Sequence, residues 1–85
     1  MKTVDPKKYN LSSRVSLQEN SSNELCIVIN RRSRIIMKDG YRILEIAEKI
    51  KQGENKRKVK VLSSAPVCSK TRAFLNKKGL YLEAL

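Results

Sequence analysis

Residues 25–29, Leu-Cys-Ile-Val-Ile, form the longest apolar run of this 85-residue chain. A continuous apolar run of this length, bounded by polar segments, is typical of a strand whose two faces are both covered. We therefore expect residues 25–29 to lie in the middle of a sheet, with the other elements arranged around them.

Two further strands are expected beside this run. Residues 14–18 alternate polar and apolar side chains, which predicts a half-buried strand, and the polar residues 19–23 predict a turn after it. Residues 30–33 resemble a hairpin connection, because asparagine at position 30 tolerates a positive φ. The chain is then expected to return as a third strand over residues 34–37, which completes an antiparallel meander.

The period changes in the second half of the chain. Apolar residues recur at positions 43, 46, 47 and 50, the spacing of an amphipathic helix, with Asp39 as its expected N-cap and Gly53 just past its end. Residues 58–62 alternate as a strand. Pro66 suits the first turn of a second helix, and Gly79 is expected to end it, with Leu80 packing back on the cap.

A short last strand is expected within residues 80–85. The predicted order is β-β-β-α-β-α-β, an α/β (α+β) two-layer sandwich with the helices on one face of a mixed sheet. The uncovered face is expected to show Arg14, Ser16 and Gln18, and Lys58 and Lys60 if their strand is a neighbour.

Residues 1–12 are polar and basic and are interrupted by Pro6. They are expected to form a flexible basic N-terminal arm. Residues 13–85 are expected to form a single small α/β domain, since a chain of this length has room for one core.

The charge balance is the main indication of function. The chain has 19 Lys and Arg against 8 Asp and Glu, a net charge of +11, and it has no histidine. Such an excess of positive charge favours a polyanionic partner, above all nucleic acid. Without histidine the commonest general base and metal ligand are missing, so we expect no enzymatic activity, no cofactor and no metal site.

The two cysteines, Cys26 and Cys68, have no metal-type spacing, and no apolar segment approaches the length of a membrane span. We therefore expect both thiols to be free, the protein to be cytoplasmic, and a membrane not to be its partner.

The favoured hypothesis is a small nucleic-acid-binding domain that contacts the phosphate backbone of DNA or RNA with little sequence specificity. The contacts are expected from two basic segments of the chain. Their residues are Arg31, Arg32, Arg34, Lys49, Lys51, Lys56, Arg57, Lys58 and Lys60. Two alternatives stay open: a charged surface that only keeps the protein soluble, and an interaction domain that forms a homodimer or docks as a subunit through a sheet face or edge.

A third alternative depends on Cys68, which is expected in the first turn of the second helix with Lys70 and Arg72 nearby, where a thiol pKa falls. The segment from Val59 to Glu83 resembles the first βαβ unit of glutaredoxins, whose helix opens with Cys-Pro-x-Cys; here residues 65–68 are Ala-Pro-Val-Cys. The resemblance implies a thioredoxin- or glutaredoxin-like thiol protein. Because Ala65 replaces the first cysteine, dithiol chemistry does not carry over, and Cys68 alone would be the reactive thiol.

Overall fold

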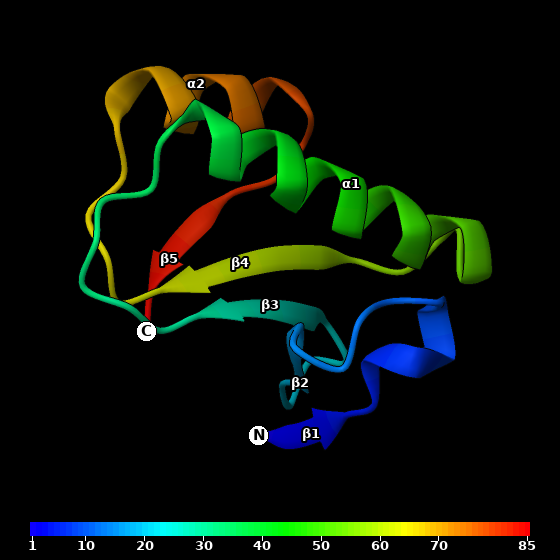
Figure 1. Cartoon of the computed structure of the whole chain (residues 1–85). Helices are drawn as coiled ribbons and strands as arrows, with labels where there is room; N and C mark the ends of the chain where they lie inside the picture. The colour runs from blue at the N-terminus through cyan, green and yellow to red at the C-terminus, as the bar shows by residue number, and fades with distance from the viewer.

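The computed structural model describes residues 1–85 and confirms the predicted α+β fold and element order. Five strands form one mixed sheet in the order β1-β2-β3-β4-β5, and Figure 1 shows both helices on the same side of it. The elements are β1 (Lys2–Val4), a 3₁₀ helix η1 (Pro6–Tyr9), β2 (Ser16–Glu19), β3 (Leu25–Ile29), α1 (Met37–Gly53), β4 (Val59–Ser63), α2 (Ser69–Lys77) and β5 (Leu82–Ala84).

The apolar run does lie at the centre of the sheet. β3 pairs antiparallel with β2 and parallel with β4, and Leu25, Cys26 and Ile27 are all buried. The β3–α1–β4 and β4–α2–β5 connections are crossovers between parallel strands, which require a helix. The carboxyl ends of β3, β4 and β5 therefore share one edge of the sheet, at the left of Figure 1.

The third strand predicted over residues 34–37 is wrong. Ile35 makes only an isolated bridge with Val67, and α1 begins at Met37. β4 occupies the edge of β3 that a returning strand would need, so the chain leaves the sheet and Ile35 is buried in the core instead. Three strands still precede α1, because the N-terminal segment supplies β1.

The expected N-terminal arm is also different in the structure. β1 pairs antiparallel with β2, and Tyr9 and Leu11 are only 5% and 8% exposed. η1 is capped by Asp5, whose carboxylate accepts a hydrogen bond from the Lys7 N–H (3.0 Å). Residues 1–12 thus contribute both an edge strand and core side chains, which single-residue polarity does not reveal.

The helix ends follow recognisable local chemistry. Asp39 lies inside the first turn of α1 and accepts a hydrogen bond from the Ile36 N–H (2.9 Å), so it stabilises the helix start from the third helical position. α2 ends as predicted: Gly79 has a φ of +78°, and the Leu80 N–H donates to the Leu75 carbonyl (2.9 Å), a Schellman motif with Leu80 buried beneath it. Neither helix has the length and apolar content that crossing a membrane requires.

Candidate nucleic-acid interface

The structure separates the expected phosphate contacts into two groups. Arg31, Arg32 and Arg34 lie in the loop after β3, at the edge formed by the carboxyl ends of the parallel strands. The remaining six lie on the second half of α1, in the loop after it or on the first half of β4; they are Lys49, Lys51, Lys56, Arg57, Lys58 and Lys60. The two groups face opposite ends of five-residue strands, so about 15 Å of sheet lies between them.

Two cations of the second group, Arg57 and Lys60, are paired with acidic neighbours, and the other four form no ion pair. Lys51, Arg57, Lys58 and Lys60 surround a hollow of about 360 Å³ that Glu24 and Glu83 also line. The Lys60 Nζ lies 2.9 Å from a Glu83 carboxylate oxygen and 3.4 Å from one of Glu24. These contacts leave Lys51 and Lys58 as the unpaired cations of this hollow.

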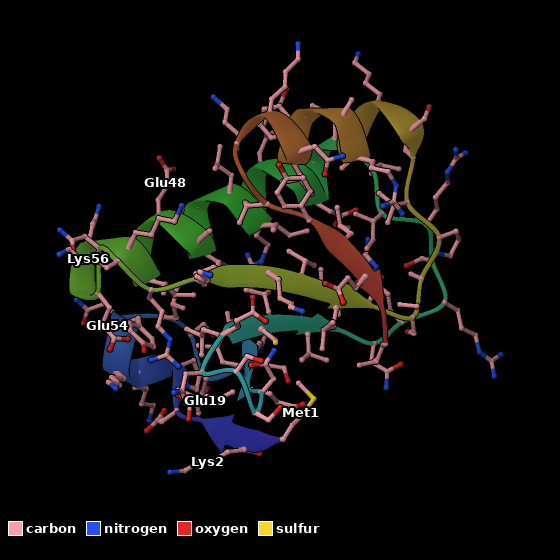
Figure 2. The ribbon with its side chains drawn as sticks, turned by 180° about the vertical axis from the view of Figure 1, so that it is seen from behind. Met1, Lys2, Glu19, Glu48, Glu54 and Lys56 are labelled. Atoms are coloured by element: carbon pink, nitrogen blue, oxygen red, sulfur yellow. The ribbon has the colours of Figure 1, made fainter.

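Arg57 is held more tightly still. Its guanidinium forms an ion pair with Glu19 and a second with Glu54 (3.5 Å), and its side chain is 17% exposed. The Tyr9 hydroxyl donates to Glu54; burial and this carboxylate raise the pKa of Tyr9 to about 12. Figure 2 shows Glu54 and Lys56 at this end of α1, with Glu48 projecting away from the sheet. Arg57 therefore joins β2 to the end of α1, and Glu54 joins the end of α1 to Tyr9.

A different set of cations lines a groove along α1. The first hollow of this groove, about 240 Å³, lies between the first half of α1 and strands β2 and β3. Arg14, Arg31, Asp39 and Arg42 form its polar rim, and it has an apolar lining of Val15, Ile27, Val28, Ile29, Ile43 and Ile46. Charges above an apolar surface interact more strongly than charges in open water.

Two further hollows extend the groove toward the C-terminal end of α1. One, of about 190 Å³, shares Val15, Arg42 and Ile46 with the first and adds Glu45 and Lys49. The other, of about 350 Å³, shares Lys49 and adds Lys8 and Tyr9. We call this row of hollows the α1 groove; its charged residues are Lys8, Arg14, Arg31, Asp39, Arg42, Glu45 and Lys49.

Arg31 is positioned in advance by its own loop. Its Nε donates to the Ser33 carbonyl (3.2 Å), and its Nη2 donates to the Arg34 carbonyl (3.3 Å) and to Asp39 (2.6 Å). The hydrogen bond from Arg31 holds the pKa of Asp39 below its usual range. The Nη1 group makes no hydrogen bond within the protein, so it can donate to a ligand without breaking this arrangement.

The charge of the α1 groove is strongly positive. Five cations line it against the carboxylates of Asp39 and Glu45, and Arg32 and Arg34 in the adjoining loop are exposed and form no ion pair. Four cations of the groove form no ion pair (Lys8, Arg14, Arg42 and Lys49), against two around the other hollow (Lys51 and Lys58). The groove is therefore the better anion site of the two.

Among the cations of the groove, the sequence predicts only Arg31 and Lys49 as phosphate contacts. Residues 1–12, which include Lys8, are expected in the arm and Arg14 on the uncovered sheet face, and no site is expected for Arg42. Arg14 instead lines the groove, because it precedes β2 and its turn is fixed by the Ser12 hydroxyl, which accepts from the Arg14 N–H (3.2 Å). Arg42 did carry a signal, since it lies one helical turn before the buried Ile46.

The uncovered face of the sheet has little free charge. Ser16, Gln18 and Lys60 share that face with Cys26 and Val28, as their pairing register requires, and Lys60 is already paired with two glutamates. This face is not a second basic surface.

The two cysteines are both free and differ in environment. Cys68 is the N-cap residue of α2 and is half-buried. The backbone N–H groups of Thr71 and Lys70 lower the pKa of its thiol. Cys26 is 1% exposed, and burial raises its pKa. No group of three or more His, Cys, Asp or Glu side chains is arranged to hold a metal ion.

The chain is similar in fold to several solved structures. No family model matches, and no curated protein matches. Among solved structures, EndoMS in its apo form is similar with a TM-score of 0.66 and 17% identity, over 82% of this chain and 33% of that one. A repair endonuclease from Pyrococcus abyssi has a TM-score of 0.65 and 14% identity, over 82% of this chain and 31% of that one.

An EndoMS complex with double-stranded DNA is also similar, with a TM-score of 0.73 and 15% identity; it covers 99% of this chain and 36% of that one. The chain thus spans about a third of the length of these neighbours, and the likeness at this identity is one of fold.

Proposed function

We propose that this chain is a nucleic-acid-binding domain that contacts the phosphate backbone along the α1 groove. The observation that carries the proposal is the convergence of Arg14, Arg31 and Arg42, from three separate segments, on one hollow with a single carboxylate. Guanidinium groups suit phosphate because each donates two parallel hydrogen bonds.

The groove has a length that suits a stretch of backbone. From Asp39 to Gly53, α1 advances about 21 Å, and one strand of a duplex advances about 3.4 Å per nucleotide, so roughly six phosphates can pass along it. Lys49 and Lys8 would meet the phosphates beyond the first hollow. Arg32 and Arg34 lie in the loop next to Arg31, outside the groove, and are not counted among its phosphate contacts.

Double-stranded DNA is the first ligand to test, because one of the structural neighbours is a complex with it and another is a repair endonuclease. Contacts from the five groove cations predict that log K falls with log salt concentration at a slope of about −4.5. RNA of the same sequence serves as the comparison, because both polymers carry the phosphate backbone that the groove would contact.

Two matched triple variants locate the interface. The first replaces Arg14, Arg42 and Lys49 by Gln, and the second replaces Lys51, Lys56 and Lys58 by Gln; each removes three of the same kind of charge from the total of +11. The groove variant should reduce the slope to about −2, and the second variant should leave it near −4.5.

Fluorescence anisotropy titrations at several salt concentrations measure both slopes. An equal loss of slope in the two variants would mean that binding depends on the overall positive charge of the protein and not on the groove. A slope near zero for the unaltered protein would remove the proposed function altogether.

A further inference from the structure

We propose that the first hollow of the α1 groove binds a terminal phosphate, so that the domain holds the phosphorylated end of a nucleic-acid strand. The inference rests on the proposed function and makes it more specific. It names the kind of phosphate that this hollow would accept.

The charge of the hollow matches a phosphate monoester better than an internal diester. Arg14, Arg31 and Arg42 against Asp39 leave two positive charges. An internal phosphodiester carries one negative charge, whereas a terminal phosphate carries about 1.5 to 2 near neutral pH and offers three acceptor oxygens. Three arginines from three segments line the hollow, which matches the number of acceptor oxygens.

The shape of the hollow supports the same conclusion. At about 240 Å³ it is smaller than the pockets that enclose whole drug-sized ligands, which begin near 300 Å³. It can hold a phosphate and part of its sugar against the lining formed by Ile27, Ile43 and Ile46. The strand would then leave through the neighbouring hollow that Arg42 and Lys49 share.

Part of this site is ordered before a ligand binds, which lowers the entropy cost of binding. Arg31 is held by its loop and by Asp39. Arg14 and Arg42 are exposed and form no ion pair, so they are free to close on a bound phosphate.

The test compares short duplexes of one sequence whose ends carry a 5′-phosphate, a 3′-phosphate or hydroxyl groups only, and a duplex closed by hairpins at both ends. We expect one phosphorylated end to bind about tenfold more tightly than the hydroxyl end, which corresponds to about 1.4 kcal/mol. The 5′ and 3′ duplexes show which end fits.

The double variant Arg14→Gln and Arg42→Gln should abolish this preference. A variant with Lys56→Gln and Lys58→Gln, which removes the same charge elsewhere, should keep it. Both sets of side chains are exposed, so the fold should tolerate the changes, and urea unfolding checks this directly.

The pH dependence gives an independent readout. The second pKa of a terminal phosphate is about 6, so the preference should decline as the pH falls through that value. Asp39 is the only other titratable carboxyl of the hollow, and Arg31 keeps its pKa low, while Arg14, Arg31 and Arg42 stay charged.

The outcomes separate the two proposals. Equal affinity for phosphate and hydroxyl ends, with a normal salt slope, would overturn end binding and leave backbone binding in place. Binding of a phosphorylated mononucleotide without salt-dependent binding of any duplex would overturn backbone binding and leave terminal-phosphate binding in place. If neither binds, both proposals fail.

Discussion

Replacing Arg57 should weaken the fold and leave nucleic-acid binding almost unchanged. Arg57 is one of the cations that the sequence suggests for phosphate contacts, but its guanidinium lies between Glu19 and Glu54 with its side chain 17% exposed. Arg57→Met keeps much of the side-chain length and removes the charge. Both carboxylates then lose their cation while remaining about one-third exposed or less, and Glu54 keeps only the hydrogen bond from the Tyr9 hydroxyl.

The size of the effect follows from this degree of burial. Exposed ion pairs contribute about 0–1 kcal/mol, and breaking a fully buried pair costs about 3–5 kcal/mol. The intermediate exposure of Arg57 places the loss at about 2 kcal/mol. For a domain of this size, that loss lowers the midpoint of thermal unfolding by about 8–16 °C.

Lys56→Met is the matched control. Lys56 is the adjacent residue, it is exposed, and it forms no ion pair, so its replacement removes the same charge with a change in stability within about 0.5 kcal/mol. Urea and thermal unfolding measure the stability of both variants, and DNA titrations measure their salt slopes. Unchanged stability in Arg57→Met would refute the structural role of Arg57. A salt slope shallower than that of Lys56→Met by about 0.9 would also count against it, because it would mean that Arg57 contacts a phosphate.

Three further results are expected. Because the pKa of Tyr9 is raised to about 12 in the fold, stability present below pH 10 should fall as the pH rises toward 12, and Tyr9→Phe should remove this decline in alkaline unfolding titrations. Cys68 should be alkylated by iodoacetamide at a lower pH and faster than Cys26, as mass spectrometry of the intact protein would show; preferential labelling of Cys26 would contradict the environments described. Gly40→Ala should destabilise the fold by about 1–2 kcal/mol, since the added methyl group would lie 2.9 Å from Thr71 Cγ2; Thr71→Ser should recover part of this loss in a double-mutant cycle followed by urea unfolding.

The elements with a strong period were predictable from the sequence. The stripe of α1, the apolar run of β3 and the alternation of β4 each reflect burial of one or both faces, which is the signal that periodicity measures. The Schellman end of α2 was also predictable, because a glycine followed by leucine satisfies that cap through local contacts.

The elements that depend on distant partners were not predictable in this way. β1 has three residues and no clear alternation; it exists because β2 offers it an edge. The packing of Tyr9 depends on Gly53, where an added Cβ would lie 3.3 Å from the Tyr9 ring. Ile35 has the composition of a strand residue, but the pairing of β3 with β4 leaves it no partner strand.

The candidate site shows the same division between local and distant information. The densest run of cations in the sequence, residues 49–60, folds beside Glu19, Glu24, Glu54 and Glu83, and two of its charges, Arg57 and Lys60, are paired with them. Glu19 and Glu24 come from the other half of the chain, so charge density within the run could not reveal the pairing.

The α1 groove, in contrast, draws its cations from segments that are far apart in the sequence. Arg14, Arg31 and Arg42 are spread over 29 positions, and they meet because the segment before β2 forms one wall of the groove while α1 forms the other. Asp39 is the only carboxylate that lines the first hollow, and Arg31 already engages it. In a chain this basic, the positions of the acidic residues therefore decide where an anion can bind: of the eight, only Asp39 lines the first hollow of the groove, and Arg14 and Arg42 there form no ion pair and are free to contact phosphate.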